Sequence, residues 1–420
     1  MRIIQDLLEK TLKNQFTLEK MGAKVIERRL EQLGVNLTED QKTKLRAELS
    51  KGGIDNLSLS LNDSQITPEM LVKQTKDSSR VVLDIGDAEP VVNEIAEQFL
   101  AQFTKAIPDM ASEIGGVITC DLNNKVKAML RRRRPYTRKY ESFITSRWGS
   151  AFDLLETMIV IATEAGEDFN EEVRREDSGN LIEATIRLYA RACQVANEVL
   201  TLLKSGYADG AHARWRCLHE IAVVLFFLAS SGEETAKRYL LHDRIESYKA
   251  ARLYQEHCER LGYEPFTEKE MNQFKMDRDR LVAQFGKCFA EEYGWAATSI
   301  GIKRPCFRDI ENQVELAHLR PFYKMASHNV HANPKGVIFK LGVFSDGPDV
   351  LLAGPSPLGL ADPGQWTAIS LLQATIALIS IEPNMDRLVI CDVMRRFSTE
   401  TENAFMAVHQ SIENEAATNK

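Results

Sequence analysis

Apolar residues recur at intervals of three and four along most of this 420-residue chain, and this spacing constrains the fold more than any other feature. It places apolar side chains on one face of an α-helix, and that face has to be buried against other helices. The sequence therefore predicts an all-α fold built as a helical bundle. The segments expected to be helical are 91–105, 122–134, 136–164, 180–203, 209–229, 235–260, 267–289, 320–332 and 365–381, followed by a final helix after Pro383.

The first 62 residues also show the helical pattern and predict a small N-terminal helical appendage. Thr38 and Gln41 have the spacing of a capping box, in which each side chain hydrogen-bonds to the backbone of the other residue. Pro68, after Thr67, is expected to begin another helix. The stretch 84–90 is expected to be a linker.

One segment departs from the helical pattern. The apolar, partly β-branched run 337–344 is followed by the turn-forming residues 345–348 and by a second apolar run, 350–353. This pattern predicts a β-hairpin inserted at about 337–353. Three parts are expected overall: an N-terminal helical region at 1–87, a helical bundle with the hairpin at 88–397, and a helix end with a polar tail at 398–420.

Composition excludes several classes of protein. Hydrophobic residues make up 44% of the chain and charged residues 27%, which is typical of a folded globular protein. The formal charge of −7 gives no overall positive field for nucleic acid. Asp6 and Glu9 interrupt the N-terminal apolar residues, so a cytoplasmic protein without a leader peptide is expected. No apolar run reaches the roughly 20 residues of a membrane span, so no membrane partner is expected.

The common metal and nucleotide motifs are missing from the sequence. His219 and Glu220 begin an HExxH pattern, but Val223 stands where the second histidine is needed. Neither GxxxxGK[ST] nor GxGxxG occurs, and the seven cysteines are too widely spaced for a zinc knuckle. We therefore expect no metal and no cofactor.

A polar group interrupts the apolar face of segment 209–229. Asp209 is the expected N-cap of this helix. At about 100° per residue, Arg216, His219 and Glu220 fall along the core-facing side. Charged groups are rarely buried without partners, so this group has to be paired or has to line a pocket.

A second polar group lies on segment 320–332, where Ser327 and His331 are four residues apart and Tyr323 is one turn earlier. We hypothesise that these residues meet the first group, with His331 as acid or base, Arg216 on a phosphate and Glu220 orienting the imidazole. In this hypothesis Ser327 joins the catalytic set, and Tyr323 and His219 lie at its edge. The alternative is a buried network that only fixes the register of the helices.

A cationic segment lies between Asp121 and Glu141, where eight Lys and Arg residues occur with no acid. This segment is suited to phosphate contacts that depend on salt and do not read sequence. A basic helix end before Pro135 would explain the same pattern, because cations are favourable at a helix C-terminus. The candidate substrate-binding residues are Arg131, Arg132, Arg133 and Arg134.

Several short motifs resemble a widespread family of uncharacterised, all-helical bacterial proteins with a domain of unknown function. They are Arg147-Trp148-Gly149, Leu154-Leu155-Glu156, Arg216 to Glu220, and Tyr323 to Ser327 with Val330-His331, and the resemblance spans about 143–386.

The layout is also similar to the HEPN superfamily, whose members include dimeric, metal-independent ribonucleases. Their motif is an Arg followed, four to six residues later, by a His. Arg214 and His219 have that spacing, but their side chains point about 140° apart on a regular helix. Before His331 the matching position is Lys324, which cannot hold a phosphate in a bidentate way. The resemblance implies an RNA-binding or RNA-cleaving effector in stress or phage defence, a homodimer, and Lys324 and Arg214 as further site residues.

The alternative function is a non-catalytic interaction or sensing module with a structural polar network. The sequence alone leaves open whether the protein is an enzyme.

Overall fold

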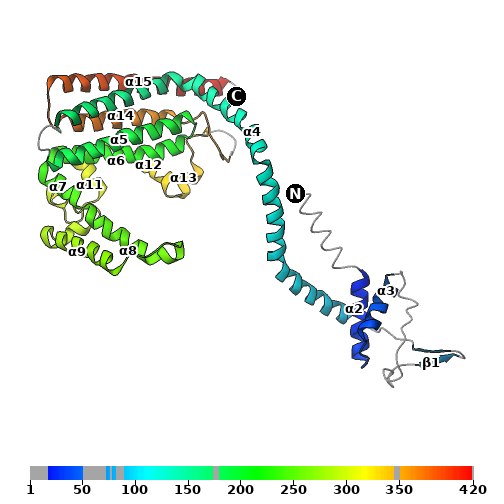
Figure 1. The fold of residues 1–420 in the computed structure, drawn as a ribbon. Coiled ribbons are helices and arrows are strands. Elements are labelled where there is room, and N and C mark those ends of the chain that lie inside the picture. The colour runs from blue at the N-terminus through cyan, green and yellow to red at the C-terminus, as the bar shows by residue number, and fades with distance from the viewer. Residues whose placement is uncertain are drawn as a thin grey trace. The chain divides into compact units, whose positions relative to one another are not determined.

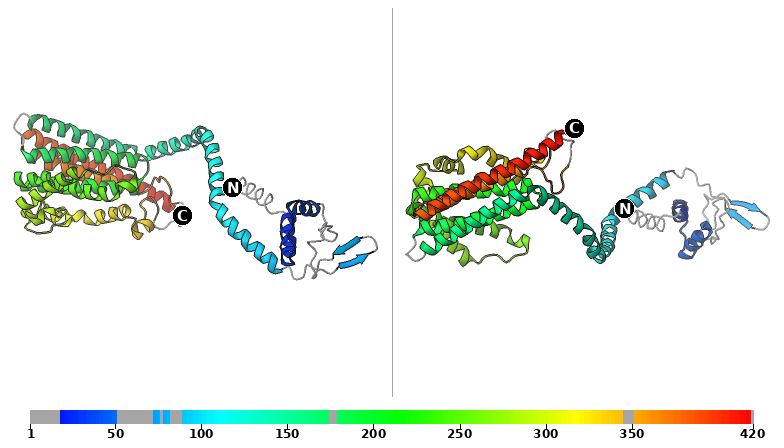
Figure 2. Two further views of the ribbon diagram at one scale, coloured as in Figure 1. Left: turned by 60° about the horizontal axis from the view of Figure 1, so that its bottom comes forward. Right: turned by 90° about the horizontal axis from the view of Figure 1, so that it is seen from above.

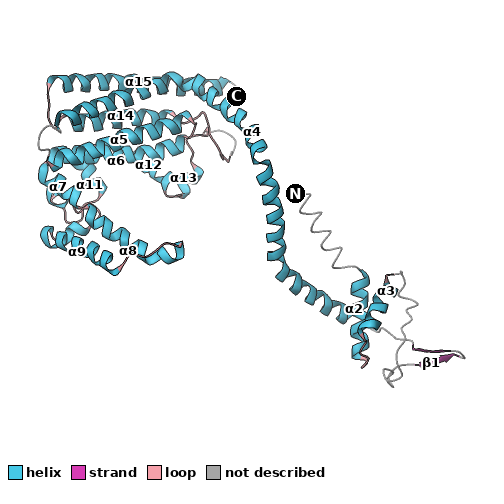
Figure 3. Ribbon diagram, viewed as in Figure 1, coloured by secondary structure: helices cyan, strands magenta, loops and turns pink. Residues whose placement is uncertain are grey.

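The computed structural model describes residues 18–50, 72–75, 78–81, 89–173, 179–344 and 351–418. Contacts divide the chain into two compact units, residues 1–133 and 134–420, and each unit is described by itself. Figures 1 and 3 show that the described elements are nearly all helices, with one pair of short strands. None of the helices in the described ranges combines the length and the apolar character needed to span a bilayer.

The elements of the first unit are α2 (Leu18–Gln32), α3 (Glu39–Leu49), β1 (Val72–Thr75), β2 (Ser78–Val81) and the first part of α4 (Glu89–Val173). The rest of α4 belongs to the second unit, with α5 (Asn180–Lys204), α6 (Ala208–Ser231), α7 (Glu233–Leu241), α8 (Asp243–Leu261), α9 (Glu268–Phe285), η2 (Lys287–Ala290), α10 (Ala297–Ile300), α11 (Phe307–Gln313), η3 (Ala317–Leu319), α12 (Arg320–Val330), α13 (Pro334–Ile338), α14 (Ala361–Ile379) and α15 (Met385–Thr418).

The bundle of the second unit is formed by α5, α6, α14, α15 and the last part of α4, which lie side by side (Figures 1 and 2). Its core contains large aromatic side chains that are almost completely buried, including Trp148 of α4, Trp215 of α6 and Phe405 of α15. Each buried indole donates to a carbonyl oxygen: Trp148 to Pro357 at 3.0 Å and Trp215 to Trp366 at 2.8 Å. These side chains therefore bury a large apolar area without leaving a polar group unpaired.

In the first unit, α2 and α3 form a small helical pair with its own core. The predicted capping box is confirmed: the backbone N–H of Thr38 donates to the Gln41 side chain at 2.9 Å, and the Gln41 N–H donates to the Thr38 hydroxyl at 3.4 Å. Thr67 and Pro68 lie outside the described residues. The next described segments, β1 and β2, are not helical. They pair as antiparallel strands, with Val72 opposite Val81. Val and Thr favour the extended backbone of a strand.

The predicted hairpin at 337–353 is not found. Val337 and Ile338 belong to the short helix α13, and the described residues 339–344 and 351–353 form no strand. The expected turn at 345–348 lies outside the described residues. Residues 334–338 form a helix although Val337 and Ile338 favour a strand. Asn333 caps this helix by accepting from the Lys335 N–H at 3.0 Å, and Pro334 occupies its first position.

The prediction of separate helices at 91–105, 122–134 and 136–164 is also wrong. A single helix, α4, extends through Pro108 and Pro135. Proline has a backbone φ angle that suits a helix and removes only one hydrogen-bond donor, so a helix can continue through it at a cost of about 3 kcal/mol.

Candidate functional site

Two helices of the second unit, α6 and α12, pack against each other and bring the predicted polar groups together. Arg216 of α6 donates from Nε to Oε1 of Glu220, one turn later, at 3.0 Å. Its guanidinium carbon lies 4.8 Å from the centre of the Tyr323 ring on α12. Its Nη1 atom lies 3.4 Å from Nε2 of His331, the C-cap residue of α12. Arg216 therefore contacts both helices.

Tyr323 fixes the carboxylate that holds Arg216. Its hydroxyl donates to Oε1 of Glu220 at 2.6 Å, the same oxygen that accepts from Arg216. Burial raises the pKa of Tyr323, and the acceptor Glu220 raises it further, so the phenol stays protonated and remains a donor. Arg216, Glu220 and Tyr323 thus form one hydrogen-bonded cluster.

This cluster reaches solvent on one side. The side chains of Arg216 and Glu220 are 21% and 33% exposed, and His331 is an exposed residue. Lys324 follows Tyr323 on α12 and is also exposed. A solute could therefore reach the edge of the cluster at His331 without a change in the fold.

Other predicted site residues point elsewhere. The Ser327 hydroxyl donates to the backbone oxygen of Tyr323 at 2.8 Å, within its own helix. Arg214 pairs with Glu198 of α5. His219 is completely buried, so it cannot touch a substrate in this conformation. Asp209 is not the N-cap of α6, which is Tyr207.

Asp209 instead ties α6 to the segment after α13. Its Oδ1 atom accepts from the Asn329 side chain at 3.2 Å and from the Leu341 N–H at 3.1 Å. The carboxylate thus accepts from the backbone N–H of Leu341, which is 132 residues away in sequence. The pattern of a single helix does not reveal such a contact.

A buried ion pair beside the cluster was not predicted. Glu311 of α11 is completely buried, and its Oε1 atom lies 2.9 Å from Nε2 of His219. Its other oxygen pairs with Arg320, the first residue of α12. Burial alone would raise the pKa of Glu311, but the hydrogen bonds from His219 and Arg320 lower it below its usual value. Glu311 is therefore ionised, and Nε2 of His219 carries the hydrogen that it donates.

The sequence contained a signal for Glu311. Phe307, Ile310, Glu311 and Val314 occupy positions i, i+3, i+4 and i+7, so the carboxylate falls on the apolar face of α11. An acid at such a position needs a buried partner.

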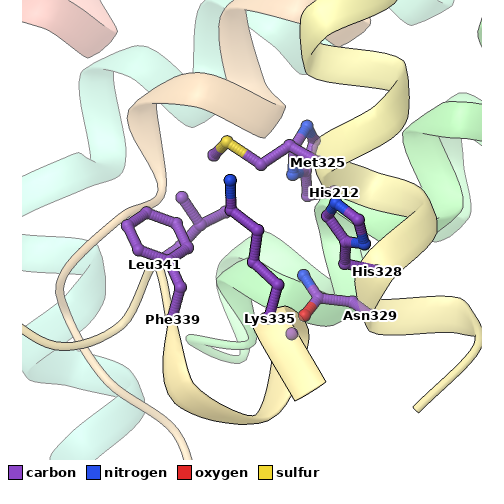
Figure 4. A pocket seen from close by; sticks show the side chains of 8 residues that line it. His212, Met325, His328, Asn329, Lys335, Phe339 and Leu341 are labelled. Atoms are coloured by element: carbon purple, nitrogen blue, oxygen red, sulfur yellow. The ribbon is translucent and has the colours of Figure 1, made fainter. Parts of the chain in front are cut away.

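A second histidine of α6, His212, is buried without a polar partner among the described residues. Its ring stacks on Trp215, with 5.3 Å between ring centres, and burial lowers its pKa to about 4. Figure 4 shows Met325, His328 and Asn329 of α12 beside it, around a cavity that Lys335 also lines. The cavity has a volume of about 10 Å³, the size of one water molecule, so it is too small for a substrate.

The described residues hold no group of three or more His, Cys, Asp or Glu side chains placed to bind a metal ion.

The cationic segment lies on α4, and its side chains from Lys125 to Lys139 are all exposed. Because α4 continues to Val173, these cations do not lie at a helix C-terminus, and the explanation as a basic helix end is wrong. Lys125 pairs with Asp121 at 2.6 Å. No hydrogen bond or ion pair within the described ranges involves any of the four predicted arginines, Arg131, Arg132, Arg133 and Arg134.

Two of the cations in the first unit share one side of the helix. At 100° per residue, Lys127 and Arg131 lie about 40° apart. Like charges three or four residues apart on a helix repel by about 0.2–0.5 kcal/mol per pair. We call these two residues the cation row. An anionic partner would relieve this repulsion.

Residues 183–348 match the model of a family of unknown function, DUF5677. The match includes α6 and α12, and so both Arg216 and His331. No curated protein and no solved structure matched the sequence.

Proposed function

We propose that this protein binds RNA and cleaves it without a metal ion, using the pair formed by Arg216 and His331. The observation that carries the proposal is the position of Nη1 of Arg216, 3.4 Å from Nε2 of the exposed His331. A guanidinium and an imidazole at one solvent-facing edge provide a phosphate-binding cation and an acid–base group.

RNA suits this pair because the ribose supplies the nucleophile. In the proposed step His331 accepts the proton of a 2′-hydroxyl, and the 2′-oxygen attacks the adjacent phosphorus. The bond from phosphorus to the 5′-oxygen breaks, and the leaving oxygen takes a proton from water. The products are a 2′,3′-cyclic phosphate and a 5′-hydroxyl, and the imidazolium then returns its proton to water.

The other residues of the cluster hold Arg216 in place for this step. Glu220 and Tyr323 fix the guanidinium from two helices, so that it can stabilise the negative charge that grows on the phosphate. Lys324 is exposed on the same helix as His331 and contributes a further positive charge. The cation row of α4 offers a separate surface for RNA phosphates.

The test is a time course of RNA cleavage by the full chain, with and without EDTA. We expect His331→Ala to lower the rate a hundredfold or more, because general acid–base groups typically contribute about 10²–10⁴. His257→Ala is the matched control, since His257 is an exposed histidine on α8, outside the cluster. The proposal requires that EDTA has no effect, that the control retains activity, and that all three proteins melt at similar temperatures.

A second candidate function is a non-catalytic interaction module. It is favoured by the hydrogen bonds within the cluster, because Glu220 accepts from both Arg216 and Tyr323 and leaves this part of the site largely satisfied. In that case the wild-type protein cleaves no RNA, and Arg216→Ala lowers the melting temperature by several degrees. The cleavage assay therefore separates the two candidates.

A further inference from the structure

A stripe of apolar side chains lies on the surface of α4, opposite the cation row. Leu122, Val126 and Met129 are 45%, 36% and 54% exposed, and Ile114 and Ile118 are partly exposed. At 100° per residue these five side chains fall within an arc of about 120°. We call them the apolar stripe. Its centre is about 180° around the helix from the centre of the cation row.

We infer that the apolar stripe is the contact surface for a second copy of this chain, with the two α4 helices antiparallel. Apolar stripes of this width are typical of helices that are covered by another helix. The inference does not depend on the proposed activity toward RNA.

The order of the residues makes the stripe complementary to an inverted copy of itself. If two copies of α4 cross in opposite directions at residue 120, Ile118 of one copy faces Leu122 of the other, and Ile114 faces Val126. Each of these pairs is apolar on both sides, so the inverted arrangement removes apolar surface from water on both helices.

The charges on α4 favour the same orientation. Before residue 122, the exposed side chains include four acids and one base: Glu97, Asp109, Glu113, Asp121 and Lys105. The segment from Lys125 to Lys139 contains eight bases and no acid. A parallel pair would place the basic segments next to each other, whereas an antiparallel pair places each one beside an acidic segment.

An anionic membrane is a less suitable partner for the stripe. A helix lying in a membrane surface places its cations near the boundary of its apolar face. Lys125, Arg132 and Arg133 meet that condition, because they fall within the arc of the stripe. The acidic side chains before residue 122 do not, because an anionic surface repels them. A second copy in the antiparallel orientation complements both the acidic and the basic segment of α4.

The first test is the mass of the full chain in solution, measured by light scattering after size-exclusion chromatography. We expect a dimer, and we expect Ile118→Lys with Leu122→Lys to weaken dimerisation at least tenfold without changing the melting temperature. Leu253→Lys is the control, because Leu253 is 61% exposed on α8 and lies outside the stripe. A monomeric wild-type protein, or a dimer that persists in the double variant, would overturn the inference.

The second test is the orientation of the helices, measured by disulfide cross-linking. Ile114→Cys and Val126→Cys are made as separate chains that also carry Cys120→Ser and Cys306→Ser, because both of these native cysteines are exposed. In the antiparallel dimer the two chains cross-link to each other when they are mixed. Cross-linking of each chain only to itself would indicate a parallel pair and refute the inference, as would a monomer that binds phosphatidylserine vesicles through the stripe.

Discussion

The buried pair of His219 and Glu311 gives a direct prediction about stability. Both side chains have zero exposed area, and Glu311 also pairs with Arg320. Glu311→Ala leaves the Nε2 hydrogen of His219 without an acceptor, inside the protein. Removing one partner of a buried charged pair costs about 3–5 kcal/mol.

The expected change in melting temperature follows from the size of the unit. For proteins of about 150–250 residues, 1 kcal/mol corresponds to about 2–4 °C. The second unit is slightly longer, residues 134–420, so we use the lower part of that range. Glu311→Ala should therefore lower the melting temperature by about 6–10 °C.

The assay is thermal unfolding followed by circular dichroism, at pH 7 and at lower pH. Glu292→Ala is the control, because Glu292 is an exposed acid near the same region, and it should change the melting temperature by less than about 2 °C. A melting temperature for Glu311→Ala within 2 °C of the wild-type value would refute the reasoning.

The same pair sets a pH dependence. The pKa of Glu311 is lowered in the folded protein, so the unfolded chain binds its proton at a higher pH than the folded chain does. The stabilisation from Glu311 is therefore complete above the unfolded pKa, about 4.3, and is lost as the pH falls toward the folded value. Glu311→Gln should show a smaller loss of stability than the wild type between pH 5 and pH 3.

Three further predictions concern two single side chains and one pair of arginines. Burial lowers the pKa of His212 to about 4, so the unfolded chain takes up a proton at a higher pH than the folded chain does. The free energy of unfolding of the wild type should therefore fall by roughly 3 kcal/mol from this group between pH 6.5 and pH 4. Urea titrations of His212→Phe over this range should show a smaller fall. Tyr323→Phe removes the hydrogen bond to Glu220 and should lower the free energy of unfolding by about 1–3 kcal/mol in urea, and an unchanged value would contradict the cluster. Arg131→Gln with Arg134→Gln should weaken RNA binding and reduce the slope of log K against log salt by about 0.7 for each RNA phosphate that the variant no longer neutralises, measured by fluorescence anisotropy.

Local patterns in the sequence predicted most of the helices. The segment 180–203 corresponds to α5, the capping residue Thr38 begins α3 as predicted, and the segment expected from 267 corresponds to the start of α9. These features depend on contacts between residues three or four apart, which the sequence displays directly.

The errors came from competition between local signals. The β-branched residues at 337–338 favoured a strand, but the cap Asn333 and the proline after it favoured a helix, and the helix formed. Pro135 indicated a helix boundary, but α4 continues through it. A single propensity is weak evidence when a second signal acts on the same residues.

The candidate site was predictable in part. The contacts of Arg216 with Glu220 and with α12 followed from the cost of burying unpaired charge. The pairing of His219 with Glu311 was not predictable, because the two residues are 92 positions apart in sequence and meet only through tertiary packing. Arg214 was expected among the site residues, but its side chain pairs with Glu198 of α5.

Cleavage of two matched oligonucleotides tests the central claim most directly. One is an RNA strand, and the other has the same sequence with a 2′-O-methyl group on every ribose, so that it lacks the nucleophile. The proposed function predicts that the wild-type protein cuts the RNA in the presence of EDTA, leaves 2′,3′-cyclic phosphate ends, and does not cut the methylated strand. Intact RNA, cleavage of both strands, or equal cleavage by His331→Ala would contradict the claim.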